Sequence, residues 1–478
     1  MSCTLSPEAL RFITYVSFKL DCSREQAELG WRLDYDRAMK NYLELEALQK
    51  EKVEQLRVSM PKVAKYTTYN KPKVMFKKDG TLSSHGETWF KRLKDNGYKA
   101  TEQGPIQVVT SYEIANPNST PQVKAWLFSL GWKPITFDYK RNKETGEERM
   151  VEQVRDDGEL CVSVKKLAAH DPAIELLDGL TVINHRMAIF KGFIECAQQK
   201  SDGTYWLKAE MQGFTNTLRY KHRKPLVNLP GVTAAYGDEI RGCLIAPEGY
   251  KVVGSDMTSL EDNMKRHYMQ PLDPVYVEEM AQEGFDPHLD LAQFAGATTQ
   301  DDIDLYNKGE KPELKAVRKI YKAANYACVY GVGAPKLART LDIPERQAKE
   351  VIEAYWERNW AIKKVADNSY VKTLKDGSMW LKNPVSGFYY SLRYDKDKWS
   401  TTAQSSGVYC FDVWIMFMRK LGVKVCASFH DEVVVVTDDP EGVEQKLQKA
   451  IEMTNDKLQL NVPLGIDVQV GDTYGDVH

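Results

Sequence analysis

The front of the chain shows helical spacing of apolar positions, interrupted by a polar stretch. Residues 1–60 are predicted to be helical, with one long polar-rich helix in their second half. Residues 61–110 contain clusters of Pro, Gly, Lys and Ser, which are typical of loops. A further helix is predicted to follow Ser119 or Thr120, because either residue can cap it and Pro121 suits its first turn.

After residue 205 the pattern changes to short apolar strands mixed with helices. Residues 249–256 (GYKVVGSD) predict a strand that ends in an acid, and residues 260–375 are predicted to be mainly helical. Residues 423–436 (VKVCASFHDEVVVV) contain two β-rich runs that meet at a polar tip, which predicts a hairpin. We therefore expect an α+β protein whose small sheet carries acids at the ends of its strands.

One predicted helix carries a row of cations and aromatic rings. Arg318, Lys322, Tyr326 and Tyr330 recur every four residues, and the row ends at Gly331. A step of four residues drifts by only about 40° around an α-helix, so the four side chains share one face. Cations bind polyphosphates and rings stack on bases, so the row predicts a nucleotide site. An amphipathic helix with a solvated basic edge would show the same pattern.

Two acids stand at strand ends that are far apart in sequence. Asp256 ends the first strand, and Asp431 lies at the tip of the hairpin. If the two ends met, the carboxylates would suit Mg²⁺, and two such ions can clamp the oxygens of a phosphoryl displacement. Each acid could instead simply cap or turn its strand. Glu261 would face the same pocket from the first turn of the next helix, although acids are favoured near any helix N-terminus.

Composition excludes some classes of protein and of metal site but does not itself indicate a function. The 478 residues carry a formal net charge of −2, so only the local basic runs at 219–224 and 311–322 favour nucleic acid. The 8 cysteines form no C-x-x-C pair, which argues against a zinc ribbon or a disulfide framework and fits a reducing compartment. His430 beside Asp431 would suit a metal phosphohydrolase, but the few histidines are widely scattered. With no signal peptide or long apolar run, we expect a cytoplasmic protein without a membrane span.

The motifs resemble those of the family A (DNA polymerase I type) DNA polymerases, in the family's order. They are Asp256-x-x-x-x-Glu261, the row that ends at Gly331, and His430-Asp431-Glu432. Weaker similarities cover nearly the whole chain, whose character is closest to phage replicative enzymes. The resemblance implies a right-hand polymerase with a palm built on a small antiparallel sheet and with mainly helical fingers and thumb. The implied parts are a helical and loop-rich N-terminal region (1–110), the thumb (111–215), the palm (216–262 and 396–478) and the fingers (263–395).

The resemblance also implies a role for each motif residue in adding dNTPs to a primer paired with template DNA. Asp256 and Asp431 are expected to hold two Mg²⁺ ions, with the Met257 carbonyl as a backbone ligand and Mn²⁺ as a substitute. Glu432 is expected to support the metal site or the primer end, and Lys322 to be catalytic as well as phosphate-binding. The other implied contacts are Arg318 and His288 to the triphosphate, Tyr326 to the base and sugar, Glu261 under the 2′ position, and Arg219, Tyr330, Gln404 and His430 to DNA.

The sequence departs from the family pattern at several places. Asn263 replaces an Arg of the family, with Arg266 nearby as an alternative cation. The stretch before the predicted long helix is far below domain size, so we expect no 3′–5′ exonuclease in this chain. A separately encoded exonuclease and a processivity factor are therefore expected partners. Residues 61–110 are a candidate docking segment for the latter, or equally a solvated connection.

Two other functions share parts of this pattern. A single-subunit RNA polymerase has the same hand shape, but that group lacks acids at the positions of Glu261 and Glu432, and its promoter-reading domain is missing. A catalytically inactive DNA-binding or priming-accessory protein is the second alternative. The joint presence of Asp256, Asp431 and Lys322 argues against it.

Overall fold

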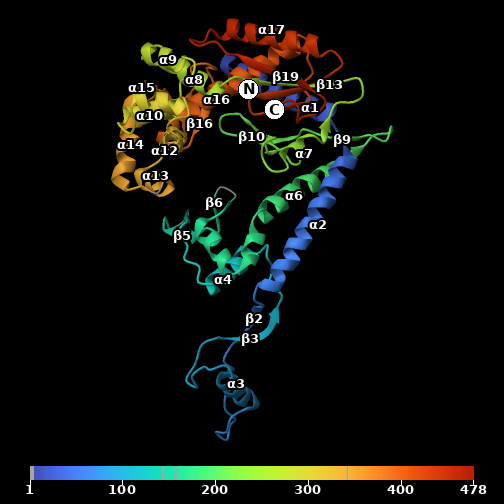
Figure 1. Cartoon of the computed structure of the whole chain (residues 1–478), viewed down its shortest axis with the longest axis vertical. Coiled ribbons are helices and arrows are strands. Elements are labelled where there is room, and N and C mark those ends of the chain that lie inside the picture. Colours follow the sequence, from blue (N-terminus) through green and yellow to red (C-terminus); the bar gives the residue numbers. More distant parts are fainter. Residues whose placement is uncertain (1–4, 143–144, 157–158, 342) are drawn as a thin grey trace. The chain divides into compact units, whose positions relative to one another are not determined.

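A computed structural model describes residues 5–142, 145–156, 159–341 and 343–478 (Figure 1). The chain divides into two compact units, one made of Met1–Ala38 and Gly192–His478 and the other of Met39–Lys191. Two helices, α2 (Tyr35–Ser59) and α6 (Leu180–Cys196), carry the chain across this division. We call the two parts unit 1 and unit 2.

The centre of unit 1 is a four-stranded antiparallel sheet with the strand order β17-β18-β13-β19. Its strands are β13 (Lys251–Met257), β17 (Ala427–Phe429), β18 (Glu432–Thr437) and β19 (Ile466–Gly471). Val253, Val433 and Val435 pack against α16 (Lys398–Lys420) and α17 (Pro440–Leu458) on one face of the sheet. Both faces of β18 are covered, so its run of valines is buried without alternation. The predicted strand and hairpin are confirmed.

A helical region follows the sheet strand β13, as predicted, and it ends at residue 367. Its helices are α8 (Leu260–Met269), α9 (Pro274–Met280), α10 (Pro287–Phe294), α11 (Gln300–Asn307), α12 (Leu314–Val329), α13 (Ala334–Leu341), α14 (Glu345–Arg358) and α15 (Trp360–Asp367). Helix α12 buries Tyr321, Ala324 and Cys328 in a core shared with α10, α13 and α14. The row of cations and rings therefore lies on the opposite face of α12, outside this core.

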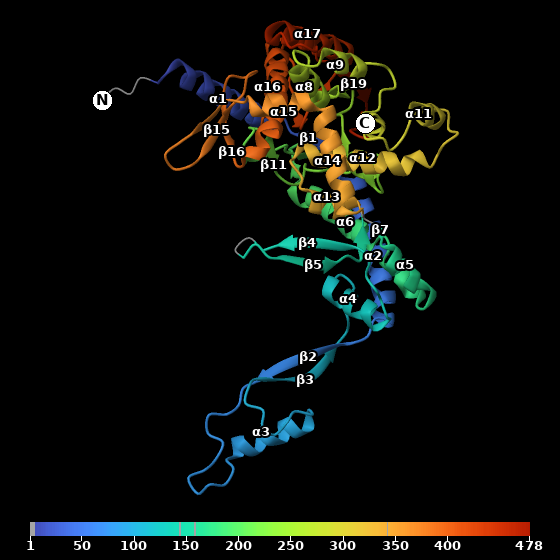
Figure 2. The same cartoon turned by 90° about the vertical axis from the view of Figure 1, so that its left-hand side faces the viewer.

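Helix α1 (Pro7–Leu29) belongs to unit 1 and is tied to α16 by a buried ion pair. Lys19 Nζ lies 2.5 Å from Asp412 Oδ2, and neither side chain is more than 2% exposed. Arg11 donates to the Ser386 carbonyl at 2.7 Å, beside the sheet of β14 (Val371–Thr373), β15 (Met379–Lys382) and β16 (Tyr389–Leu392) (Figure 2). Gln26 donates to Ser428 Oγ at 3.0 Å, so α1 also contacts strand β17.

Short strands and turns complete unit 1. One sheet orders its strands as β12-β1-β9-β8, and β10 pairs with β11. These strands are β1 (Trp31–Leu33), β8 (Gln198–Gln199), β9 (Tyr205–Leu207), β10 (Met211–Phe214), β11 (Tyr220–His222) and β12 (Leu244–Ile245), accompanied by α7 (Gly237–Arg241) and η3 (Asp395–Asp397).

Among its described residues, unit 2 shows two small cores. The stretch predicted as loop-rich also holds β2 (Val63–Tyr69), α3 (Ser84–Asp95) and the start of β3 (Ile106–Glu113), because Trp89 and Leu93, four residues apart, bury one helix face. The second core is built around Trp126 and Leu127. Its elements include α4 (Thr120–Ser129), β4 (Phe137–Arg141), β5 (Glu148–Glu152), β6 (Arg155–Asp156), β7 (Glu159–Leu160), α5 (Val162–Lys165), η1 (Lys166–Ala169) and η2 (Pro172–Leu177).

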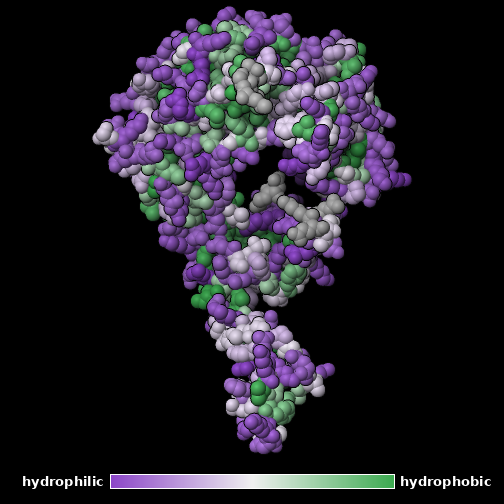
Figure 3. Space-filling view, turned by 180° about the vertical axis from the view of Figure 1, so that it is seen from behind, coloured by the Kyte–Doolittle hydropathy of each residue, from purple (hydrophilic) through white to green (hydrophobic). Residues whose placement is uncertain are grey.

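The face shown in Figure 3 is mostly hydrophilic, with hydrophobic residues in scattered groups. Within the ranges that the structure describes, no helix is long and apolar enough to cross a membrane.

Candidate active site

The predicted acid pair comes together at one end of the central sheet. Asp256 on β13 is the register partner of Glu432 on β18, and the Met257 N–H donates to the Asp431 carbonyl at 3.0 Å. His430 adopts a left-handed backbone with a φ of 60°, which allows the tight turn between β17 and β18. This turn places Asp431 beside the end of β13, so the strand ends meet as the sequence predicted.

The electrostatics of this cluster suit a bound cation. Burial, the largest cause, and the charges of Glu432 and Asp431 together raise the pKa of Asp256 to about 6. Three carboxyl groups therefore repel one another, and a divalent cation would relieve that repulsion. Within the described residues, no three or more His, Cys, Asp or Glu side chains are grouped as a ready-made metal site. Two carboxylates with positions left for water and substrate oxygens match the preference of Mg²⁺.

Glu432 is held differently from the two aspartates. Its Oε2 accepts a hydrogen bond from the Tyr474 hydroxyl at 2.9 Å, and its Oε1 lies 2.8 Å from Nε2 of His478. Tyr474 is itself enclosed, with its ring 4.8 Å from that of Trp31 and the Arg241 guanidinium 4.5 Å from its centre. Both oxygens of this buried carboxylate have neighbours on the C-terminal residues, so Glu432 suits a supporting role beside the acid pair.

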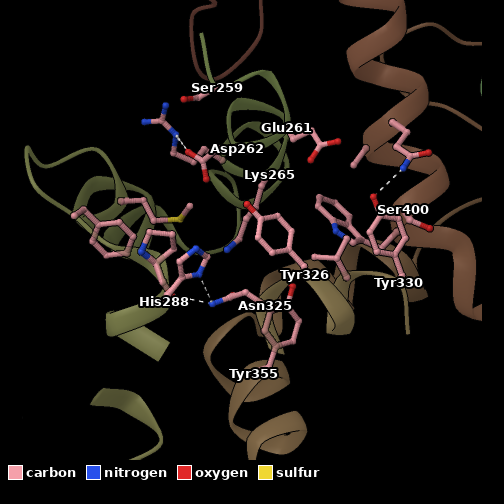
Figure 4. A pocket seen from close by; sticks show the side chains of 18 of the residues that line it. Ser259, Glu261, Asp262, Lys265, His288, Asn325, Tyr326, Tyr330, Tyr355 and Ser400 are labelled. Atoms are coloured by element: carbon pink, nitrogen blue, oxygen red, sulfur yellow. Dashed lines mark hydrogen bonds and ion pairs between the residues drawn. The ribbon is translucent and has the colours of Figure 1, made fainter. Parts of the chain in front are cut away.

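A cavity of about 570 Å³ is lined by three of the five residues expected to bind a nucleotide, while the row cations Arg318 and Lys322 are not among its lining residues. Its lining includes Glu261 from α8, His288 from α10, Tyr326 and Tyr330 from the row, and Gln404 from α16 (Figure 4). Tyr330 caps the C-terminus of α12, and its hydroxyl accepts a hydrogen bond from Gln404 Nε2 at 3.2 Å. Residues from four helices that are distant in sequence thus share one cavity.

The row cation Arg318 is linked to the start of α10. Its Nε lies 2.5 Å from Oδ2 of Asp286, the residue that caps α10. Asn325 Nδ2 lies 3.1 Å from the Pro287 carbonyl and 3.2 Å from Nδ1 of His288. Burial lowers the pKa of His288, and the positive charges of Arg318, Lys322 and Lys265 contribute to that shift. His288 is therefore neutral near pH 7 and surrounded by cations.

A second group of basic and imidazole side chains flanks the acid pair. Arg219 follows the turn between β10 and β11, and its charge helps lower the pKa values of both His430 and His222. The rings of these two histidines are 5.8 Å apart. Burial, the largest cause, brings the pKa of His222 to about 4, so this histidine is neutral at physiological pH. Arg219 and His430 thus lie close together, next to Asp431.

Comparison with known proteins identifies the family. The sequence pattern of "DNA polymerase family A" matches residues 90–385. The chain belongs to DNA polymerase family A. The predicted family and the α+β polymerase fold are therefore confirmed.

Relatives within family A are distant in sequence. The chain is 23% identical over 408 residues to "DNA polymerase I" of Geobacillus stearothermophilus, covering 81% of this chain and 43% of that protein. It is 25% identical over 279 residues to the thermostable "DNA polymerase I" of Thermus aquaticus, covering 55% of this chain and 32% of that protein. The chain thus spans less than half the length of these curated relatives.

One solved family A structure covers nearly the whole chain. It is the POL domain of Pol1 from M. smegmatis, described as a complex with DNA primer-template and dNTP. The TM-score is 0.62 and the identity 18%, over 96% of this chain and 70% of that one. At this identity the likeness establishes the fold.

Some residues of the site escaped the sequence analysis. Asp286 and Asn325 position Arg318 and His288, and Lys265 lines the cavity. A signal for Lys265 was present, because it follows Glu261 by four residues and so shares its helix face. No sequence pattern shows that Asp286 meets Arg318, since the contact depends on how α10 packs on α12.

The departure at Asn263 has a local explanation. Asn263 is buried, and its Nδ2 donates to the Thr258 carbonyl at 2.7 Å, at the start of α8. Arg266 donates to Asn263 Oδ1 and pairs with Asp262 at 3.1 Å. Arg266 is therefore engaged by its own helix and is a poor substitute for a free cation.

Proposed function

We propose that the chain is a DNA-directed DNA polymerase that adds dNTPs to the 3′ end of a primer on a DNA template. The observation that carries this proposal is the meeting of Asp256 and Asp431 at the end of the sheet, through the hydrogen bond between Met257 and Asp431. Only one turn separates Asp256 from the helix whose Glu261 lines the cavity. An acid pair beside a cavity with cations and rings is the arrangement that nucleotidyl transfer requires.

Each group has a distinct part in this proposal. Two Mg²⁺ ions, or Mn²⁺ in their place, held by Asp256, Asp431 and the Met257 carbonyl would stabilise the charge of an in-line displacement at phosphorus. The row cations Arg318 and Lys322 bind the triphosphate together with His288. Positioning accounts for much of phosphoryl-transfer catalysis, so these contacts are part of the chemistry.

The remaining residues select the nucleotide and hold the DNA. Tyr326, which lines the cavity and is 57% exposed, offers a ring face to the incoming base and sugar. Glu261 collides with a ribose 2′-hydroxyl and so favours dNTPs. Tyr330, joined to Gln404, lies at the template base, and Arg219 and His430 contact primer and template. Glu432, which is next to Asp431 and opposite Asp256 in the sheet, supports the acid pair.

Primer extension tests the proposal directly. The purified chain is incubated with Mg²⁺, a labelled primer on a DNA template, and either dNTPs or rNTPs. We expect extension with dNTPs and its loss in Asp431→Ala, while Asp438→Ala, an exposed acid after β18, extends normally. Extension with rNTPs only would identify an RNA polymerase, and binding of DNA without extension would identify an accessory protein.

Two finer parts of the proposal rest on the sequence resemblance alone. They are a role in phage DNA replication, and proofreading by a separately encoded exonuclease, with a processivity factor as a further partner. Release of label from a mismatched primer by the purified chain would contradict the second part. Copurification of an exonuclease with the chain from infected cells would support it.

A further inference from the structure

Lys265 is a cation in the nucleotide cavity without a role in the family motifs. It lies on α8, four residues after Glu261, and both residues line the cavity. Figure 4 shows its side chain directed into the cavity between those of Tyr326 and His288. The side chain therefore points to the space where the triphosphate, base and sugar of a nucleotide would meet.

The acids nearest to Lys265 are already paired with arginines. Asp262 lies 3.1 Å from Arg266, and Asp290 lies 2.7 Å from Arg358. Within the described part of the chain, Lys265 Nζ has no hydrogen bond or ion pair, and its nearest ring contact is Tyr276 at 5.7 Å. The cavity thus contains an ammonium group without an anionic partner.

The charge of Lys265 carries a free energy cost that a bound anion would offset. Burial lowers the pKa of Lys265 to about 8, against the opposing pull of Asp262 and Asp290, so the group is still largely charged at pH 7. Lys265 is partly buried, and a partly buried charge without an ion pair is unfavourable, so binding of an anion next to it recovers that cost.

Three cations and the acid Asp286 affect the pKa of the same histidine. Arg318, Lys322 and Lys265 all act on the pKa of His288 through their charges, which brings all three within electrostatic range of its ring. The first two approach from α12 and the third from α8, so positive charge borders His288 from two helices. A polyphosphate with several charged oxygens can satisfy cations on both sides, whereas a base or sugar cannot.

We propose that Lys265 is a further nucleotide-binding residue, which donates to a phosphate oxygen of the incoming nucleotide together with Arg318 and Lys322. The proposal rests on the assignment of this cavity to nucleotide binding. It predicts that Lys265 adds to affinity for the triphosphate, with little effect on recognition of the base, the sugar or the DNA.

The test compares Lys265→Met, which keeps the length of the side chain without the charge, with Lys265→Arg, which keeps the charge. Calorimetry with inorganic tripolyphosphate measures binding without catalysis. We expect Lys265→Met to weaken tripolyphosphate binding and to raise the KM for dNTP about tenfold or more, with kcat and primer–template Kd within twofold. Lys265→Arg should stay within threefold of the native chain. Thermal unfolding should show Lys265→Met to be at least as stable, because it removes a partly buried charge that has no ion pair.

Several results would overturn the proposal. One is an unchanged affinity for tripolyphosphate and an unchanged KM in Lys265→Met. Another is an equal loss of affinity for dNMP and dNTP, which would place Lys265 at the base or sugar. Should Lys265→Met not fold, Lys265→Gln takes its place in the same comparison. A native chain that binds tripolyphosphate through Lys265 but extends no primer would contradict the proposed polymerase function and leave the phosphate site standing.

Discussion

Asp256 connects the proposed chemistry with a cost in folding stability. Its pKa is raised to about 6 by burial and by the neighbouring carboxylates. The folded state therefore holds the proton more tightly than the unfolded state, in which the pKa of an Asp is ~3.9. Ionised Asp256 destabilises the fold fully above pH 6, and this cost disappears as the pH falls below that unfolded value.

We predict that Asp256→Asn abolishes primer extension and stabilises the metal-free protein. After discounting for partial exposure, the gain in unfolding free energy at pH 8 should be about 1–2 kcal/mol. Thermal unfolding with chelator present measures it, and the gain should vanish near pH 4. Asp438→Asn, at an exposed acid, is the control and should change stability little at either pH. A gain that persists at pH 4 would contradict the electrostatic origin.

Tyr326 is predicted to make the enzyme tolerant of dideoxynucleotides. As the family resemblance implies, its hydroxyl can replace the hydrogen bond of a missing 3′-OH. Tyr326→Phe should therefore raise the preference for dNTP over ddNTP from about tenfold or less toward about a thousandfold, a change of roughly 3 kcal/mol or more by rate arithmetic. Single-turnover incorporation measures this ratio. Tyr330→Phe removes the neighbouring hydroxyl of the row and should leave the ratio unchanged.

At the scale of elements, α1 depends on its buried ion pair with α16. Lys19→Met leaves Asp412, only 2% exposed, without its cation and should cost about 3–5 kcal/mol of unfolding free energy. The double variant Lys19→Met with Asp412→Leu should recover most of that loss, because apolar groups can replace a buried pair. Chemical denaturation of the native chain and both variants gives the comparison. A double variant no more stable than Lys19→Met would show that the ion pair is not the cause.

Elements with a regular pattern could be predicted from sequence, and contacts between distant elements could not. The spacing of the row, the valines of β18 and the acid at the end of β13 each follow a local rule. The pair of Lys19 and Asp412 joins residues 393 apart, and no periodicity marks either one. Glu432 was found by its motif, but its contact with His478 depends on how the C-terminal residues cover the sheet.

At the scale of the molecule, all the proposed catalytic and nucleotide-binding residues belong to unit 1. The segment between Val63 and Glu113 belongs to unit 2, and those two residues are register partners at the base of β2 and β3. Because the ends of this segment are neighbours, residues 64–112 can be replaced by a short Gly-rich turn without stretching the chain.

We predict that this deletion leaves single-nucleotide insertion within about twofold of the native rate, because it removes no residue of unit 1. Single-turnover extension by one nucleotide measures insertion. The product length after one binding event measures processivity, which shows whether the segment helps to hold the chain on DNA. As a control, the same deletion combined with Asp431→Ala should be inactive. Loss of insertion in the deletion itself would show that residues 64–112 take part in the chemistry.

The hydrogen bond between Met257 and Asp431 sets the distance between the two acids by strand pairing. Helices α9 to α15, which lie between β13 and the hairpin in sequence, contribute no described residue to the core in which β13 and β18 pack against α16 and α17. Insertions, deletions or repacking among these helices can therefore change which nucleotide is admitted while the reacting centre keeps its geometry. A shift of β13 by one residue against β18 would have the opposite effect, since it would turn Asp256 to the other face of the sheet while the nucleotide contacts from α10 and α12 stay in place.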